Sequence, residues 1–119
     1  MKPSSAKAKG RNFQNKVRQM IIDALDINPL DIKTAVMGES GMDIKLSSAA
    51  RDKFGYAVEC KKVEKINIWK CYEQSTENSE DLEPLLIFSK NNSKTMVCFE
   101  FKHLLSLINE SNGFRRLTK

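Results

Sequence analysis

The chain has 119 residues, of which 40% are hydrophobic and 29% charged, and its formal net charge is +5 at pH 7. This length fits one compact domain with a single core and leaves little room for a second. No apolar run approaches the ~20 residues needed to span a bilayer, and the basic N-terminus lacks the apolar segment of a signal peptide. We therefore expect an intracellular, cytoplasmic protein.

Positive charge is grouped in two parts of the chain. The first group precedes every acidic residue and consists of Lys2, Lys7, Lys9, Arg11, Lys16 and Arg18. The second group consists of Lys61, Lys62, Lys65 and Lys70. Grouped Lys and Arg suit a polyanion, because contacts with phosphates release counterions. On charge alone, a solvated basic face without a partner is an equally good interpretation.

Cysteine and histidine give no sign of a zinc site or a disulfide framework. Cys60, Cys71 and Cys98 are widely spaced, odd in number and form no CxxC or Cys/His cluster. We expect reduced thiols. His103 is the single histidine and has no such partner in sequence, so we expect it to be an ordinary surface residue.

The first predicted element is a flexible basic arm at residues 1–10, whose composition is too polar to form a core. From Arg11, apolar residues recur at helical spacing and predict an amphipathic helix that ends before Asn28-Pro29. Period-two alternation with β-branched residues predicts a strand at residues 32–36. After a glycine-rich turn, alternation resumes and predicts a second strand at residues 42–46, with Asp43 pointing away from the core.

The later elements follow from the same signals. They are a short helix at residues 47–54, a strand at 56–63, a helix at 66–78, antiparallel strands at 85–88 and 95–99, and a helix from 101 to about 108 that frays by 113. This order predicts an α/β fold in which a mixed central sheet is flanked by helices, in one domain at residues 11–119.

Candidate catalytic residues lie on the predicted strands. Because side chains alternate along a strand, Glu59 and Lys61 share one face of the 56–63 strand, and Cys60 lies on the other. Mg²⁺ prefers oxygen ligands and usually takes one or two carboxylates, which Asp43 and Glu59 could supply, with the backbone carbonyl of Cys60 as a third ligand. Lys61 could help to deprotonate an attacking water and offset charge on a phosphate. The set suits phosphodiester hydrolysis, although spacing alone favours a surface Glu/Lys pair at a strand edge.

The flanking residues carry a resemblance to a known family. Residues 41–43 followed by residues 58–61 resemble the core motif of the PD-(D/E)xK nuclease superfamily, with Met42 where proline often stands. Residues 9–15, 37–43, 47–51, 59–65 and 67–74 are similar, in order, to small phage-type endonucleases related to Holliday junction resolvases. The resemblance covers roughly residues 9–88.

This resemblance implies a restriction-endonuclease-like core and Mg²⁺-dependent cleavage of DNA, with Mn²⁺ as a substitute and Asp43, Glu59 and Lys61 as the catalytic set. Many relatives carry a further acid on the first helix, and Gln14 stands at that place. Gln74 resembles a glutamine that faces the site in several branches, and Ser40 lies in a turn that could touch phosphate. The simpler interpretations are a helix-surface amide for Gln74 and a turn-forming residue for Ser40.

The expected substrate is branched DNA, such as a Holliday junction. The residues expected to contact phosphates are Lys9, Arg11, Lys62, Lys65 and Lys70. No module for reading base edges is visible, which favours recognition of shape over sequence. A substrate with two scissile strands also favours a homodimer. The alternatives are a non-catalytic nucleic-acid-binding module on a nuclease-like scaffold and a small basic adaptor. Trp69 and Tyr72 could stack on an unpaired base, but we expect them in the core.

Overall fold

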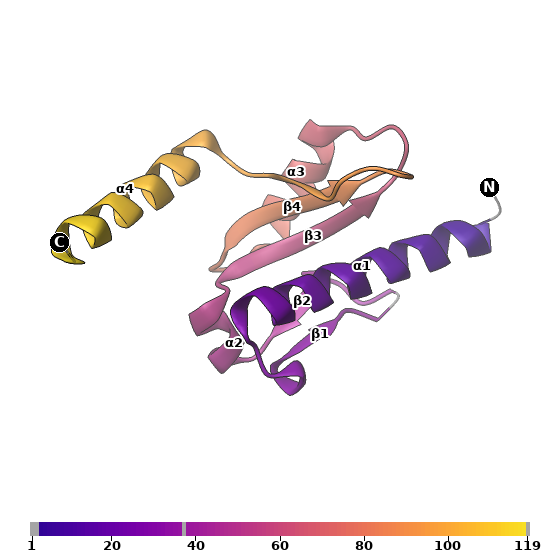
Figure 1. Ribbon diagram of the computed structural model, residues 1–119. Coiled ribbons are helices and arrows are strands. Elements are labelled where there is room, and N and C mark those ends of the chain that lie inside the picture. Colours follow the sequence, from indigo (N-terminus) through magenta and orange to yellow (C-terminus); the bar gives the residue numbers. More distant parts are fainter. Residues whose placement is uncertain (1–2, 37, 119) are drawn as a thin grey trace.

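The computed structural model describes residues 3–36 and 38–118, and its helices and strands follow the predicted order (Figure 1). The elements are α1 (Pro3–Leu25), a 3-10 turn (Pro29–Asp31), β1 (Ile32–Thr34), β2 (Ile44–Leu46), α2 (Ser48–Lys53), β3 (Tyr56–Lys62), α3 (Ile68–Glu77), β4 (Glu83–Ser89), β5 (Met96–Cys98) and α4 (Phe101–Thr118). The predicted α/β class is confirmed. Within the described residues, no helix is long and apolar enough to cross a membrane.

Three strands form a mixed sheet between two helices. β3 and β4 are parallel, and β5 pairs antiparallel with β4, as the sequence predicted for the last two strands. Parallel neighbours need a crossover connection, which α3 provides. α1 lies along one face of the sheet and α3 lies on the other (Figure 1). This arrangement confirms the mixed sheet flanked by helices.

The β1–β2 hairpin forms a separate two-stranded sheet instead of joining the central one. The two sheets meet at Asp43, whose backbone N–H donates to the Val58 carbonyl at 2.9 Å. The next donor on this edge of β3, the Cys60 N–H, is taken by the Asp43 side chain instead of a backbone carbonyl. A side chain therefore interrupts the ladder at the point where the sequence predicted one continuous sheet.

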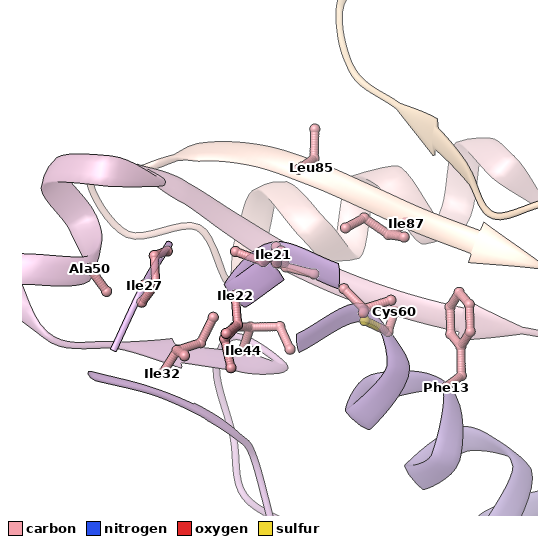
Figure 2. Close-up of a cluster of buried hydrophobic side chains, with 12 residues drawn as sticks. Phe13, Ile21, Ile22, Ile27, Ile32, Ile44, Ala50, Cys60, Leu85 and Ile87 are labelled. Carbon is pink, nitrogen blue, oxygen red and sulfur yellow. The ribbon is translucent and has the colours of Figure 1, made fainter. Parts of the chain in front are cut away.

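The core fills the space between α1, the hairpin and the sheet (Figure 2). Its members are apolar side chains that are buried together: Phe13, Val17, Ile21, Ile22, Ile27, Ile32, Ile44, Ala50, Val58, Cys60, Leu85 and Ile87. Alternation along β3 puts Val58 and Cys60 in this cluster, as predicted. The residues between them, Ala57 and Glu59, are also buried, so β3 is covered on both faces.

Residues 3–10 form the first turns of α1, where the composition had predicted a flexible basic arm. Pro3 opens the helix, a position where its missing N–H costs nothing. The following Lys and Ala residues have high helix propensity, and Gly10 lowers it by only about 1 kcal/mol. Residues 1–2 lie outside the described part of the chain. The basic side chains of this segment are therefore carried on a helix that continues into the core.

Two other predictions about the second half of the chain are wrong. α4 runs through Gly113 to Thr118 instead of ending there, and it projects away from the rest of the molecule (Figure 1). The radius of gyration is 15.4 Å, compared with about 13 to 14 Å for a compact chain of this length. Trp69, expected in the core, is 86% exposed because it lies on the outer side of α3.

Candidate active site

Asp43 is held in place by three hydrogen bonds. Its carbonyl accepts from the Ala35 N–H at 2.8 Å, its N–H donates to Val58, and its carboxylate Oδ2 accepts from the Cys60 N–H at 2.7 Å. The first bond ties Asp43 to the far side of its own hairpin, and the other two tie it to β3. The hairpin therefore fixes the orientation of one carboxylate oxygen, and the described residues include no backbone donor to the other.

Glu59 lies in the middle of β3 and is 5% exposed. Burial, and after it the negative charge of Asp43, raise the pKa of Glu59 to about 7. Lys61 and the side chain of Asn78 act in the opposite direction. Burial also raises the pKa of Asp43. The charge of Asp43 therefore reaches Glu59 and disfavours its ionised form, which is an arrangement that a cation between the two carboxylates would relieve.

Lys61 lies beside both acids. Its Nζ is 3.9 Å from Glu59 Oε1, and its positive charge lowers the pKa of Asp43 and of Glu59. A separation of 3.9 Å is an ion pair without a direct hydrogen bond. The ammonium group is therefore not fixed by Glu59, and its side chain is one-third exposed, so it can reach a bound molecule. Strand alternation predicted this shared face for Glu59 and Lys61.

The donor set at this edge suits a hard divalent cation. Asp43 and Glu59 offer carboxylate oxygens. The N–H and the C=O of one strand residue point to the same edge, so the carbonyl of Cys60 points to the side from which Asp43 approaches. Oxygen donors of this kind match Mg²⁺, which completes its shell with water and substrate. Among the described residues, no three His, Cys, Asp or Glu side chains cluster as metal ligands.

Asp43 opens into a cleft of about 490 Å³ between α1 and the hairpin. We call this the Asp43 cleft, and its lining residues are Lys7, Gly10, Arg11, Gln14, Asn15, Thr34, Ala35, Val36, Gly38, Glu39 and Asp43. Gln14 and Asp43 therefore share one cleft, as the resemblance implied. Glu59 and Lys61 do not line it, and they meet Asp43 at the edge of β3. Arg11, one of the residues predicted to contact phosphate, lines the cleft together with Lys7 from the preceding turn.

The other predicted site residues lie at different distances from this centre. Gln74 is exposed on α3, one turn before Asn78, and the described hydrogen bonds include none from its side chain to Asp43, Glu59 or Lys61. Lys9 and Lys62 line a second hollow of about 450 Å³ with Lys16, where Lys62 Nζ lies 5.9 Å from the centre of the Phe13 ring.

Lys65 and Lys70 are exposed outside both hollows, Lys65 on the connection between β3 and α3 and Lys70 on α3 itself. The predicted phosphate contacts therefore divide into two sets. Lys9, Arg11 and Lys62 lie on or beside α1, and the two remaining lysines lie on the β3–α3 connection and on α3.

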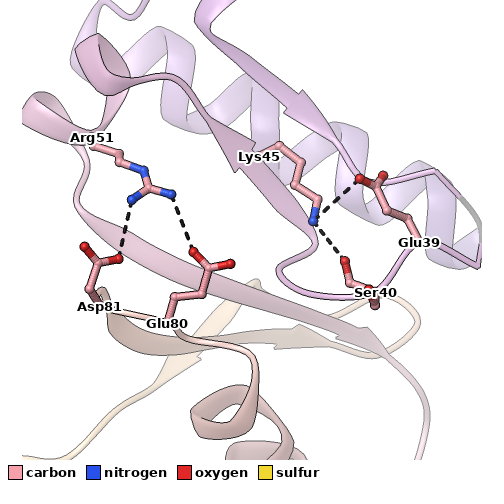
Figure 3. Close-up of polar contacts among 6 residues, drawn as sticks. All are labelled: Glu39, Ser40, Lys45, Arg51, Glu80 and Asp81. Carbon is pink, nitrogen blue, oxygen red and sulfur yellow. Dashed lines mark hydrogen bonds and ion pairs between the residues drawn. The ribbon is translucent and has the colours of Figure 1, made fainter.

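The turn before Asp43 is shaped by glycine and by Lys45. Gly38 and Gly41 have positive φ angles of 84° and 93°, which other residues rarely adopt. Lys45 Nζ donates to the backbone carbonyl of Ser40 at 3.0 Å and lies 3.7 Å from Glu39 Oε2 (Figure 3). The Glu39 carboxylate also accepts from the Val36 N–H, which lowers the pKa of Glu39. Ser40 is exposed in this turn, as a turn-forming residue would be.

Three residues near the site were not singled out from the sequence. Asn78 interacts with Glu59 through its side chain, Lys45 acts on Asp43 by its charge, and Lys7 lines the Asp43 cleft. Asn78 caps the C-terminus of α3, and its distance from Glu59 in sequence hides the contact. Lys7 could have been found if the helix had been extended backwards from Arg11, since residues four apart share a face.

The cysteines, His103 and the two aromatic residues of α3 lie outside the Asp43 cleft. All three cysteines are free, with Cys60 buried and Cys71 and Cys98 partly buried. His103 is not an ordinary surface residue, because its Nε2 is 2.7 Å from the Tyr56 hydroxyl. Trp69 and Tyr72 line a separate hollow beside Phe101, on the outer side of α3. The aromatic pair therefore does not belong to the Asp43 cleft.

Comparison with known proteins adds no relative: no family model, curated protein or solved structure matches the chain. The motifs and the geometry of the chain itself are therefore the grounds for assigning a function.

Proposed function

We propose that the chain is a Mg²⁺-dependent DNA endonuclease that hydrolyses phosphodiester bonds and selects branched DNA such as a Holliday junction. The observation that carries the proposal is the bond from the Cys60 N–H to Asp43, which brings the Asp43 carboxylate to the edge of β3 beside Glu59 and Lys61. Two carboxylates and a lysine in this arrangement match the PD-(D/E)xK motif that the sequence resembles.

Each residue has a defined part in the proposed reaction. Asp43, Glu59 and the Cys60 carbonyl would hold the cation, which when bound polarises a phosphate and promotes attack by water. The Cys60 N–H keeps the Asp43 carboxylate oriented. Lys61 offsets the negative charge that grows on the phosphate oxygens in the transition state. Gln14 supplies an amide on the α1 side of the cleft that binds water or a phosphate oxygen.

The surroundings of the site suit a nucleic acid backbone. Lys7 and Arg11 line the Asp43 cleft, and Lys9, Lys16 and Lys62 line the neighbouring hollow on the same helix. Lys and Arg along one helix form a track for phosphates that carries no base information. Contacts of this kind are consistent with recognition of DNA by its backbone and shape instead of its sequence.

A cleavage assay tests the proposal directly. Purified protein is incubated with labelled linear and four-way DNA, with Mg²⁺, with Mn²⁺ and with EDTA, beside Asp43→Ala and Lys61→Ala. We expect metal-dependent cutting, faster on the four-way DNA, that both substitutions abolish. Asp52→Ala and Lys94→Ala change exposed residues outside the cleft and serve as matched controls.

The possible failures are distinguishable. If the wild-type protein cuts neither DNA with either metal, the enzyme is ruled out, and binding that persists would favour the non-catalytic module. If Asp43→Ala cuts as fast as the controls, the site assignment fails while the activity stands. Equal cutting of linear and four-way DNA would remove the preference for branched substrates only.

A further inference from the structure

α4 carries an apolar face that no other element of the described chain covers. Phe101, Leu104, Leu105 and Ile108 form one stripe, because residues three and four apart lie on the same side of a helix. Phe101 is 72% exposed and the other three are 39 to 49% exposed. The opposite side of the helix carries Lys102, Ser106, Asn109 and Glu110. An amphipathic helix of this kind normally buries its stripe, so α4 presents it to a partner.

α4 is attached to the body by its polar side instead. His103 points away from the stripe, since it is about 160° around the helix from Phe101 at 100° per residue. Its Nε2 is 2.7 Å from the Tyr56 hydroxyl, and its ring packs edge-on against Tyr56 and Phe99 with centres 5.4 Å apart in each case. These contacts fix the first turn of the helix beside Tyr56, the first residue of β3, and direct the stripe outwards.

The same molecule has an open apolar groove beside this anchor. The groove has a volume of about 410 Å³, within the range of concave binding sites. It lies between α1 and the sheet, and its walls include Met20 and Leu25 of α1, Leu85 and Ile87 of β4, and Met96 and Val97 of β5. Met20, Leu25, Met96 and Val97 are each 40 to 53% exposed. Tyr56 and Phe99, the residues that hold His103, also line it.

We propose that the apolar stripe of α4 docks into this groove on a second copy of the chain, and that the second copy returns the same contact. A helix that binds a groove presents apolar residues at spacings of three, four and seven, as Phe101, Leu104, Leu105 and Ile108 do. Both surfaces belong to one chain. In a two-fold dimer, the stripe of each copy can therefore occupy the groove of the other, and both stripes and both grooves are covered. The proposal stands independently of the nuclease activity.

The groove of the same chain is a poorer acceptor for this helix. α4 begins three residues after β5 ends, and the His103 contacts hold its first turn with the stripe facing away from the body. To reach its own groove, the helix would have to rotate and break the contacts of His103 with Tyr56 and Phe99. In the reciprocal arrangement these contacts remain in both copies.

Self-association of the full chain tests the proposal. Sedimentation of the wild-type protein is expected to show a dimer. Leu104→Glu with Ile108→Glu in the stripe, and Met20→Glu in the groove, should each weaken dimerisation by about 100-fold or more, because a buried charge replaces an apolar anchor. Ser106→Glu and Asn109→Glu on the polar side are matched controls and should leave the dimer intact. Circular dichroism confirms that each variant is folded.

Mixing the two defective variants gives the sharper result. The stripe variant keeps a normal groove and the groove variant keeps a normal stripe, so the mixture should form a heterodimer with one intact contact, while each variant alone stays monomeric. A monomeric wild-type protein overturns the proposal. Dimerisation of Met20→Glu as tight as that of the wild type also overturns it, because the stripes would then pair with each other and not with the groove.

Discussion

At the scale of single residues, the Asp43 side chain makes two separate interactions. Its carboxylate satisfies the buried N–H of Cys60, and its negative charge disfavours the ionised form of Glu59. The first interaction stabilises the fold, and the second belongs to the proposed cation site. Substitutions that keep one interaction and remove the other can separate their effects on stability and on cleavage.

Asp43→Asn keeps an oxygen that can accept from the Cys60 N–H, whereas Asp43→Ala leaves that donor unpaired. We expect Ala to lower the free energy of unfolding by about 1 to 3 kcal/mol more than Asn, the usual cost of an unsatisfied buried group. Urea denaturation of both variants in EDTA measures this difference. Cleavage should be lost in both, so equal stabilities would show that the Cys60 bond contributes little to folding.

Glu59→Gln should raise stability at alkaline pH in the absence of metal. The pKa of Glu59 is about 7 in the folded protein and 4.5 without the fold. The unfolded chain therefore loses its proton first, and stability falls as the pH rises from about 4.5 to about 7. The loss is about 3 kcal/mol. Glutamine cannot ionise, so the variant should unfold at higher urea than the wild type at pH 8 and at similar urea at pH 4. A benefit that is equal at both pH values would contradict this origin.

At the scale of elements, alternation and helical spacing predicted most of the fold. They placed β3, its two faces, the helix α3 and the antiparallel β5, because each of these depends on neighbours a few residues apart. The pairing of Asp43 with Cys60 depends on two segments that meet only after folding, and it replaced a continuous sheet by two. The sequence therefore identified which residues form the candidate site and could not give the bond that assembles them.

The structure of residues 3–10 and the exposure of Trp69 also depend on contacts that form only after folding. Residues 3–10 have good helix propensity but nothing apolar to bury, so composition alone favoured an arm, whereas an existing helix can extend through them. Trp69 was expected inside because it is large and apolar, but its position on α3 faces away from the sheet. Packing decides which side of a helix meets its neighbour, and the spacing of apolar residues along the sequence predicts that side only in part.

The extended α1 leads to a prediction about DNA binding. Lys7 and Arg11 lie one turn apart on the wall of the Asp43 cleft. Replacing either with Ala should weaken binding to all DNA sequences alike and reduce the slope of log K against log salt by about 1, the effect of one lost phosphate contact. Fluorescence anisotropy in Ca²⁺ at several salt concentrations measures this slope. Lys53→Ala on α2 is the control. An unchanged slope in both cleft variants would mean that DNA binds to another surface of the protein.

At the scale of the whole molecule, the cation should act as a stabiliser of the fold. A ligand that binds only the native state, at about 100 times its Kd, adds about 3 kcal/mol. We expect Mg²⁺ to raise the thermal midpoint of the wild-type protein at pH 8, where Glu59 is ionised, and to have much less effect at pH 5.

Differential scanning fluorimetry with and without Mg²⁺ tests this, with Glu59→Gln as the variant and Asp52→Ala as the control. The control should respond like the wild type, and the variant should respond weakly. A rise of the same size in all three proteins would mean that the ion binds elsewhere. Because the readout is stability, it holds whether or not a suitable DNA substrate has been found.

Because the two sheets are separate, the β1–β2 hairpin can move relative to β3. The amides between β3 and β4 are closed by a backbone ladder, but the Cys60 amide is closed by the side chain of a different segment. If the hairpin lifts as a unit, the Cys60 amide exchanges with deuterium while its ladder neighbours stay protected. The same excursion would carry the Asp43 carboxylate away from Glu59. Exchange at this one amide would then report how often the candidate site comes apart and forms again.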